Sequence, residues 1–175
     1  MSKSQTTSNK RPKKLILSKK AKILREIAKP VPIKDIGSKK IASVIARMRK
    51  AMRAEKDGVA IAAPQVGESL RIFLVDDKTL NTNKDLVFIN PELVKLSRKK
   101  EEMEEGCLSL RYLYGKVLRS EKATVRALDA DGRKFEIGAS GLLAQIFQHE
   151  TDHLNGILFT DKAKNVVNIP PKDAK

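Results

Sequence analysis

The sequence contains no tryptophan, one cysteine and no long apolar run, and these absences exclude several classes of protein. A single cysteine, Cys107, cannot form an internal disulfide, so a disulfide-stabilised fold is excluded and a reducing compartment is expected. No stretch approaches the roughly 20 consecutive apolar residues that a helix needs to cross a bilayer, and no apolar block follows the charged start as in a secretory signal. We therefore expect a cytoplasmic protein without a membrane partner.

The composition is that of one folded domain with a basic extension. The 175 residues are 41% apolar and 33% charged, which is enough to build one core. Residues 1–14 carry five basic residues and no acidic ones, which predicts a disordered basic tail. Residues 15–163 are expected to form a single domain, and residues 164–175 a short polar tail. The net charge of +15 predicts attraction to polyanions and does not indicate a fold.

Two helical patterns flank a region of short strands. From Ser38, which is placed to cap the first turn, apolar residues recur at helical spacing as far as Met52. A second helix is expected to begin at Ser140 and to stop near Gly156. The expected strands lie between them, at residues 59–62, 71–75, 86–89, 92–96, 122–128 and 134–137. The order of these elements predicts an α+β fold rather than alternating βαβ units.

The strongest chemical signal is an HExxH motif within the second predicted helix. The two histidines of the chain stand in the segment His149-Glu150-Thr151-Asp152-His153. Side chains four residues apart on a helix lie about 5–6 Å apart on one face, so both imidazoles can reach one cation. Glu150 lies about 100° round the helix from His149 and is the natural general base for a water molecule on the metal. The alternative is a pair of core histidines held by ordinary hydrogen bonds.

Two further segments are candidates to complete the site. A catalytic metal usually has three protein ligands, and Glu105-Gly106-Cys107-Leu108-Ser109 supplies the only thiol. A lone cysteine is more often a small buried hydrophobe, so this segment by itself leaves both interpretations open. The segment from Gly58 to Gly67 has small residues that permit close approach of a substrate backbone, and one amide side chain, Gln65. Taken alone, that segment is more simply a packed strand followed by a turn.

In order along the chain, these three segments resemble the motifs of the peptide deformylases, which are GxGxAAPQ, then EGCLS, then HExxH on a helix. The likeness extends from Ile23 to Phe159. The resemblance implies one catalytic domain over residues 15–163, an α+β fold with antiparallel or mixed sheets packed around a central helix that carries HExxH. It also implies a metal-dependent hydrolase that removes the formyl group from the N-terminal formylmethionine of newly synthesised proteins and releases formate.

The resemblance assigns roles to individual residues. The implied ligands of one divalent ion are Cys107, His149 and His153. Iron(II) is the expected ion because family members typically use it, with zinc, nickel and cobalt as alternatives. Glu150 would carry a proton to the departing amine. The side-chain amide of Gln65 and the backbone N–H of Leu108 would stabilise the oxyanion.

The implied substrate site lies beside the first motif. The formylmethionyl peptide would add as an extended strand along Val59 and Ala60, next to Gly58. An apolar pocket partly lined by Val59, Leu142 and Ile146 would take the methionine side chain. Backbone pairing of this kind is independent of peptide sequence, so we expect selectivity to come from the pocket.

The chain departs from the family pattern in two places. Ala60 replaces the second glycine of the first motif, at a cost of about 1 kcal/mol if that backbone needs a positive φ. After EGCLS the chain has Leu110-Arg111-Tyr112 where many members have an aliphatic residue and proline, so peptide preference beyond the first residue is expected to differ.

Arg119 is the expected ionic partner of Glu105, as structural support for the cysteine segment. Asp152 is expected to form hydrogen bonds rather than to bind metal, because its helical phase differs from that of the histidines.

Two other functions share some of these features. A metalloprotease would also carry HExxH, but it leaves an upstream thiol ligand unexplained. A noncatalytic RNA-binding domain is motivated by the charge of +15, yet no RNA-binding motif is present and 4% aromatic content leaves few surfaces on which bases can stack. Contact between the basic tail at residues 1–14 and ribosomal RNA is a hypothesis without a motif behind it.

Overall fold

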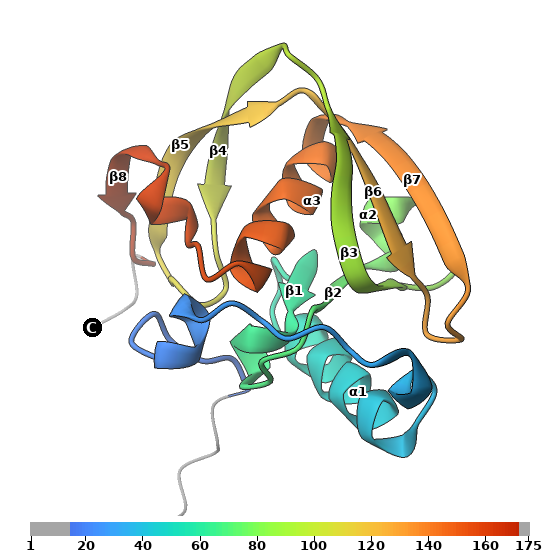
Figure 1. The fold of residues 1–175 in the computed structure, drawn as a ribbon. Helices are drawn as coiled ribbons and strands as arrows, with labels where there is room; N and C mark the ends of the chain where they lie inside the picture. Colours follow the sequence, from blue (N-terminus) through green and yellow to red (C-terminus); the bar gives the residue numbers. More distant parts are fainter. Residues whose placement is uncertain (1–14, 172–175) are drawn as a thin grey trace, which may run out of the picture.

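The computed structural model describes residues 15–171, which form two antiparallel sheets with helices packed on them (Figure 1). The α-helices are α1 (Lys39–Arg53), α2 (Asp77–Leu80) and α3 (Gly141–Leu154). The strands are β1 (Ala60–Ala62), β2 (Ile72–Val75), β3 (Leu86–Leu96), β4 (Lys100–Gly106), β5 (Leu113–Ser120), β6 (Lys122–Leu128), β7 (Lys134–Ser140) and β8 (Lys164–Asn168). Short 3-10 helices cover Lys22–Arg25, Ile33–Asp35, Ala63–Val66 and Phe159–Asp161. The tail expected at residues 1–14 lies outside the described residues.

The predicted α+β class is confirmed, and the sheets are antiparallel. One sheet has the strand order β1-β2-β3-β6-β7, and the other has the order β4-β5-β8. Every pair of neighbouring strands in these sheets is antiparallel. Within residues 15–171, the parallel pairing is limited to an isolated bridge between Lys29 and Leu70. The order places β1 at the edge of its sheet, where a further strand can be added.

The five-stranded sheet is buried on both faces in the region of β2. Ile72 and Leu74 pack in one apolar cluster with the buried face of α1, whereas Phe73 and Val75 pack in a second cluster with α3. Successive side chains of a strand point to opposite faces, so a strand between two helices needs a continuous apolar run. This explains why residues 72–75 are apolar without alternation.

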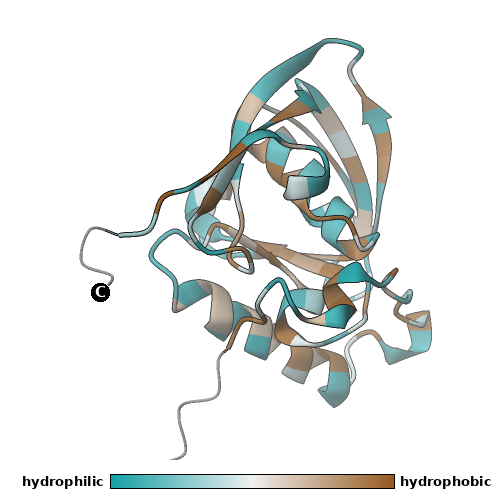
Figure 2. Cartoon of the chain, turned by 90° about the vertical axis from the view of Figure 1, so that its left-hand side faces the viewer, coloured by the Kyte–Doolittle hydropathy of each residue, from teal (hydrophilic) through white to brown (hydrophobic). Residues whose placement is uncertain are grey.

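Helix α1 forms as the sequence predicts. The Ser38 hydroxyl accepts a hydrogen bond from the Ile41 N–H at 3.3 Å and so caps the first turn. The buried residues of the helix recur three and four positions apart, from Ile41 to Met52. Figure 2 shows hydrophobic and hydrophilic segments sharing this helix and the strands above it. The apolar stripe faces the sheet and anchors the chain just before β1.

Helix α3 carries the HExxH segment and packs against the five-stranded sheet, with further contacts to β5 of the other sheet. It ends at Leu154, and Gly156 follows with φ of 71°. A Cβ at Gly156 would lie 2.7 Å from the backbone oxygen of Arg25, so glycine is required there for packing as well as for conformation. None of the described helices has the length and apolar character needed to span a bilayer.

Three strands were absent from the sequence expectation. Strands β4 and β5 lie at residues 100–106 and 113–120, where no strand was predicted. Strand β8 occupies residues 164–168, where a polar tail was expected, and it pairs with β5. All five residues of β8 are exposed, so backbone pairing rather than apolar burial makes it a strand. A hydrophobic pattern cannot reveal such a strand.

Candidate active site

Three predicted ligands come together from two parts of the fold. The ligand atoms of Cys107, His149 and His153 all lie within 4.8 Å of one another. The histidines project from one face of α3, with ring centroids 4.9 Å apart. Cys107 directly follows β4, and its Sγ lies 3.3 Å from His153 Nε2. Because metal–sulfur and metal–nitrogen bonds are about 2.3 and 2.0 Å long, a single ion fits among these atoms.

The electrostatics of the cysteine also fit a metal ligand. Burial by itself would raise the pKa of the Cys107 thiol, but the charge of His153 and hydrogen bonds with both histidines lower that pKa to about 5. A thiol with this pKa is a thiolate at neutral pH, which is the form that binds metal. The donor set of one thiolate and two imidazoles therefore suits a divalent transition metal.

Glu150 is buried beside these residues and has the properties of a proton carrier. Its Oε2 atom is buried without a hydrogen-bond partner among the described residues. Burial raises the pKa of the Glu150 carboxyl, although the charges of His149 and His153 oppose the shift. A carboxylate whose pKa moves toward neutrality exchanges protons efficiently, as a general acid and base must.

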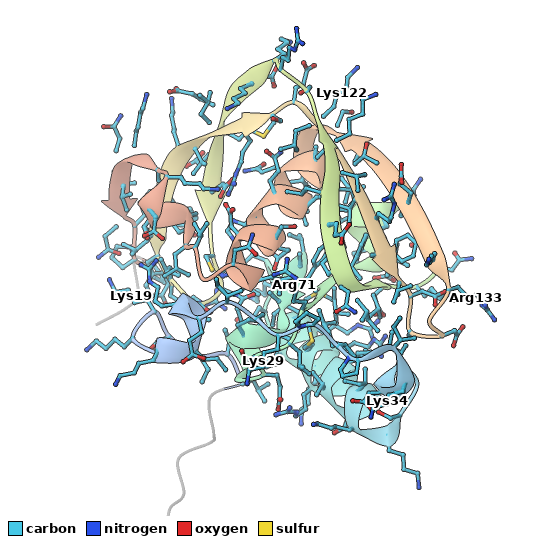
Figure 3. All side chains as sticks on the ribbon, in the orientation of Figure 1. Lys19, Lys29, Lys34, Arg71, Lys122 and Arg133 are labelled. Carbon is cyan, nitrogen blue, oxygen red and sulfur yellow. The ribbon has the colours of Figure 1, made fainter. Side chains whose placement is uncertain are left out.

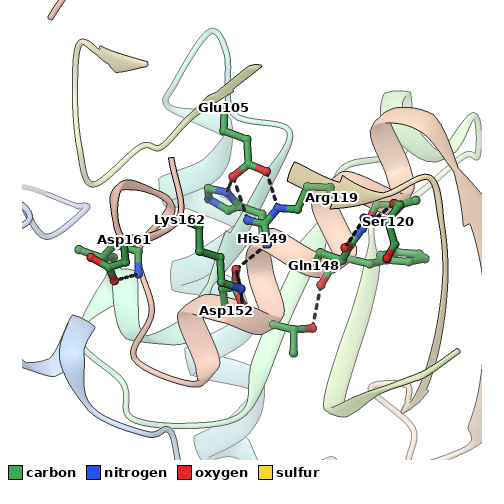
Figure 4. A network of polar contacts seen from close by, with 12 residues as sticks. Glu105, Arg119, Ser120, Gln148, His149, Asp152, Asp161 and Lys162 are labelled. Carbon is green, nitrogen blue, oxygen red and sulfur yellow. Dashed lines mark hydrogen bonds and ion pairs between the residues drawn. The ribbon is translucent and has the colours of Figure 1, made fainter. Parts of the chain in front are cut away.

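A buried ionic network supports the ligands from behind (Figure 4). Glu105 Oε2 accepts a hydrogen bond from His149 Nδ1 at 2.9 Å, while Arg119 donates to both oxygens of Glu105 at 2.6 and 2.9 Å. Arg119 also donates to Asp152 at 2.6 Å, and Asp152 accepts from Lys162 at 2.7 Å. Burial would raise the pKa of Glu105, but its hydrogen bonds from His149 and Arg119 lower it to about 2. The network fixes which nitrogen of His149 faces the other ligands.

Gln65 is held with its N–H groups toward the cysteine. Its Oε1 accepts a hydrogen bond from the Ala62 N–H at 2.8 Å, which fixes the orientation of the amide. Its Nε2 donates to Ser109 Oγ at 3.2 Å and lies 3.6 Å from Cys107 Sγ. The side chain is buried in the short helix Ala63–Val66, directly after β1. This arrangement presents a fixed donor at the ligand cluster.

A cleft of about 350 Å³ opens beside the ligands. The predicted site residues that line it are Val59, Ala60, Gln65, Glu105, Cys107, Leu108, Leu142, Ile146, His149 and Glu150. Val59 and Leu142 are 38% and 58% exposed, so apolar surface is presented to the cleft. The structure thus gathers side chains that are more than 80 residues apart in the sequence.

Gly58 is the predicted substrate residue that the structure does not bring into the cleft lining. A Cβ at this position would lie 2.1 Å from the Met52 backbone oxygen, so the glycine is required by the close approach of α1. Packing against α1 is therefore sufficient to explain a glycine at this position. The penalty considered for Ala60 does not arise, because Ala60 lies in β1 and is not among the residues with positive φ.

The sequence matches a family model described as polypeptide deformylase over residues 13–168. The chain belongs to this family. It is 45% identical over 146 residues to the peptide deformylase of Carboxydothermus hydrogenoformans, covering 83% of this chain and 90% of that protein. The peptide deformylase of Halothermothrix orenii is 46% identical over 144 residues, covering 82% and 89%.

Solved deformylase structures share the fold. The crystal structure of a peptide deformylase from Legionella pneumophila has a TM-score of 0.78 and 42% identity, covering 86% of this chain and 85% of that one. The Met-Ala-Ser-bound crystal structure of a class I type b peptide deformylase from Acinetobacter baumannii has a TM-score of 0.76 and 35% identity, covering 84% and 96%. The protein is therefore a hydrolase that removes the N-formyl group from nascent peptides, as its family does. The family is metal-dependent, and the cysteine and histidine cluster is a group that could hold an ion.

The deformylase cleft also contains residues that the motifs did not indicate. Asp57, Glu104, Arg111 and Gln145 line it together with the motif residues. Gln145 donates to the Glu104 backbone oxygen at 2.8 Å and joins α3 to β4. Gln145 lies four residues before His149, so helical spacing could have identified it. Asp57 and Arg111 lie in loops and Glu104 lies near the end of β4, and their places in the cleft depend on tertiary packing, which gives no local signal.

Proposed function

We propose that Cys107, His149 and His153 bind one divalent ion, iron(II) in the native protein, and that Glu150 carries the proton in hydrolysis of the formyl amide. The proposal rests on one observation, the convergence of the three ligand atoms within 4.8 Å beside a cleft lined by Glu150 and Gln65. A thiolate ligand weakens Lewis acidity relative to neutral ligands, which favours an easily dehydrated ion such as iron over zinc. When bound, the ion supplies a Lewis acid and lowers the pKa of water.

The residues of the chain account for the remaining chemistry. Glu150 accepts a proton from the attacking water and delivers it to the amine nitrogen as the bond from carbon to nitrogen breaks. The products are formate and a free amino terminus. The Gln65 side-chain N–H and the Leu108 backbone N–H stabilise the negative oxygen that develops on the formyl carbon, and loss of one such donor typically costs about 10²–10³ in kcat.

The proposed path of the substrate follows the unpaired edge of β1. Strand β1 is the edge strand of its sheet, so an extended peptide can pair with its outer edge. The Val59 carbonyl already accepts a hydrogen bond from the Asp76 N–H at 2.9 Å, so we assign the pairing to the outward-facing backbone groups next to it, beginning with those of Ala60. Val59, Leu142 and Ile146 line the cleft and present the apolar surface that a methionine side chain requires. The related Acinetobacter baumannii deformylase has been crystallised with Met-Ala-Ser bound, which supports a substrate of this kind.

The deciding experiment measures formate release from formyl-Met-Ala-Ser by anaerobically purified protein loaded with iron, nickel or zinc. We expect activity with iron or nickel in the wild type. Glu150→Ala is expected to keep its metal and lose activity by several orders of magnitude, whereas Cys107→Ser is expected to lose metal as well. Full activity of Glu150→Ala, or metal bound equally well by Cys107→Ser, would contradict the assigned roles.

Contact of the basic tail with ribosomal RNA and a cytoplasmic location stay predictions. Deletion of residues 1–14 tests the first of these by co-sedimentation with ribosomes at low salt. If the tail makes phosphate contacts, the deletion weakens co-sedimentation, and raising the salt concentration abolishes it in the full chain. Equal co-sedimentation of both proteins would exclude that role for the tail.

A further inference from the structure

The positive charge of this protein is concentrated at one end of the sequence. Residues 1–40 contain 13 basic and 2 acidic residues, whereas residues 41–175 contain 23 and 19. Eleven of the fifteen net charges therefore fall in the first 40 residues. The folded domain after residue 40 is close to balanced, so the excess charge is a property of one segment rather than of the whole surface.

The described part of this segment presents a row of exposed lysines, which we call the basic strap. Its members are Lys19, Lys20, Lys22, Lys29 and Lys34. None of the five forms an ion pair with a residue in the range 15–171, although Arg25 in the same segment pairs with Asp161. Figure 3 shows Lys19, Lys29 and Lys34 spread along the lower part of the molecule. Their charges are therefore not neutralised within the described fold.

The backbone beneath the basic strap is fixed along its length. The Lys19 N–H donates to the Ser109 backbone oxygen at 2.9 Å, and the Lys29 N–H donates to the Ser69 backbone oxygen at 3.0 Å. Val31 exchanges two hydrogen bonds of 2.8 Å with the side chain of Asn90. The backbone that carries these lysines is therefore held in place, which reduces the conformational entropy lost when they bind a long ligand.

Helix α1 extends the positive surface, and the lysines in its first turn do not stabilise the helix itself. Lys39 and Lys40 occupy its first turn, which contains no acidic residue. The N-terminus of a helix carries a partial positive charge, so cations there are unfavourable by about 0.3–1 kcal/mol each at low salt. An anion bound near this turn would remove that repulsion.

We propose that the basic strap is a docking surface for the phosphate backbone of RNA. Lysines spaced along a segment that is anchored to the fold match a linear polyanion, and single-strand phosphates are contacted without regard to base sequence. An anionic membrane fits less well, because the described helices of this segment are 3-10 helices of four and three residues, too short to offer an amphipathic face. The choice of RNA rests on the proposed function, since a newly synthesised peptide is made where RNA is abundant.

The location of the basic strap connects docking to the catalytic cleft. Lys19 and Lys20 line a second cavity of about 330 Å³ together with residues 108–113. Leu108 and Arg111, on that same loop, line the catalytic cleft on its other side. RNA bound along the strap would therefore lie one loop away from the substrate site and hold the enzyme near emerging chains.

The test compares two full-length variants that lose the same charge. The strap variant carries Lys→Gln at residues 19, 20, 22, 29 and 34, and the control carries Lys→Gln at residues 78, 84, 95, 122 and 134, which are exposed lysines elsewhere on the fold. Binding to a 20-nucleotide oligouridylate is measured from 50 to 300 mM salt. We expect the strap variant to bind about tenfold more weakly or worse at 0.1 M salt, with the slope of log K against log salt reduced by about 3.5 if all five lysines contact phosphates. The control is expected to bind like the wild type.

Several outcomes would overturn the proposal. Equal weakening in both variants would show that total charge, and not the strap, governs binding. Absence of oligouridylate binding by the wild type, or binding to phosphatidylserine vesicles that exceeds binding to RNA, would exclude RNA as the ligand. Formate release from formyl-Met-Ala-Ser is expected to be unchanged in both variants, and it is assayed in parallel. A wild type that binds RNA but releases no formate would contradict the proposed function and leave the docking surface standing.

Discussion

Replacing Arg119 with methionine removes the cation that holds two buried carboxylates. Arg119 is 3% exposed, and it donates three hydrogen bonds, two to Glu105 and one to Asp152. Asp152 keeps Lys162 as a partner at 2.7 Å, whereas Glu105 keeps only His149. Removal of one partner from a buried ionic group typically costs about 3–5 kcal/mol, because the remaining charge is left uncompensated.

The pKa of Glu105 gives a second route to the magnitude. The pKa falls from 4.5 to about 2 in the folded protein, through hydrogen bonds from both His149 and Arg119 that outweigh burial. A shift of this size corresponds to about 3 kcal/mol of interaction with the ionised carboxylate. Arg119 accounts for only a share of that energy, and its bond to Asp152 adds to the share. The share of Arg119 at Glu105 is therefore below about 3 kcal/mol, and with the lost bond to Asp152 the total is expected near the lower end of the range for a broken buried pair, at about 3 kcal/mol.

Urea unfolding at pH 7 with fixed metal loading measures this loss directly. In thermal unfolding of a domain of this size, a loss of about 3 kcal/mol corresponds to a fall in Tm of roughly 6–12 °C. Arg126→Met is the matched control, since Arg126 pairs with Glu136 at 3.1 Å but both side chains are about half exposed. Exposed pairs of this kind contribute about 0–1 kcal/mol.

The reasoning fails if Arg119→Met and Arg126→Met lose similar free energy, or if Arg119→Met loses less than about 1 kcal/mol. A double-mutant cycle with Glu105→Gln sharpens the test, because the two side chains are directly bonded. We expect a coupling energy above about 1 kcal/mol, since contacting ionic groups are not additive. Additive losses would show that the network is not an energetic unit.

Three further predictions concern the rest of the fold. The pKa of Asp85 is lowered, because hydrogen bonds and charge from Arg49 outweigh burial. The ionised Asp85 carboxylate therefore stabilises the fold above about pH 4, and this stabilisation is lost as the pH falls through the folded pKa. The difference in unfolding free energy between the wild type and Asp85→Asn should narrow on acidification, and a difference that widens would contradict this. Phe147→Ala should cost about 3–5 kcal/mol in urea unfolding, because the fully buried ring contacts two other phenylalanine rings, and a loss below about 1 kcal/mol would show that the core collapses around the cavity. The Tm of Gly58→Ala should be well below the Tm of Gly138→Ala. The new Cβ would lie 2.1 Å from a backbone oxygen at position 58 but 3.5 Å from a side-chain oxygen at position 138. Equal Tm values would show that the chain before β1 shifts freely.

The sequence was sufficient for features that depend on local spacing. Apolar residues three and four apart predicted α1 with its Ser38 cap, and the same geometry placed His149 and His153 on one face of α3. The three motifs and their order identified the family, which the family model confirms. A period of 3.6 residues is set by the helix itself, so it can be recognised without knowledge of the partner surface.

The tertiary structure alone decided what lies behind and beside the motifs. The charged segment of β4 and the exposed residues of β8 become strands because β5 lies between them, and no hydrophobic pattern marks either one. Pairing of Asp152 with Lys162 joins a helix to the segment that follows it, and only the fold shows that Arg119 bridges Asp152 to Glu105. Only the fold shows that Gly58 is required by the close approach of α1. Hydrogen bonds and close packing between distant segments depend on three-dimensional proximity, whereas a periodic pattern records only which face of an element is apolar.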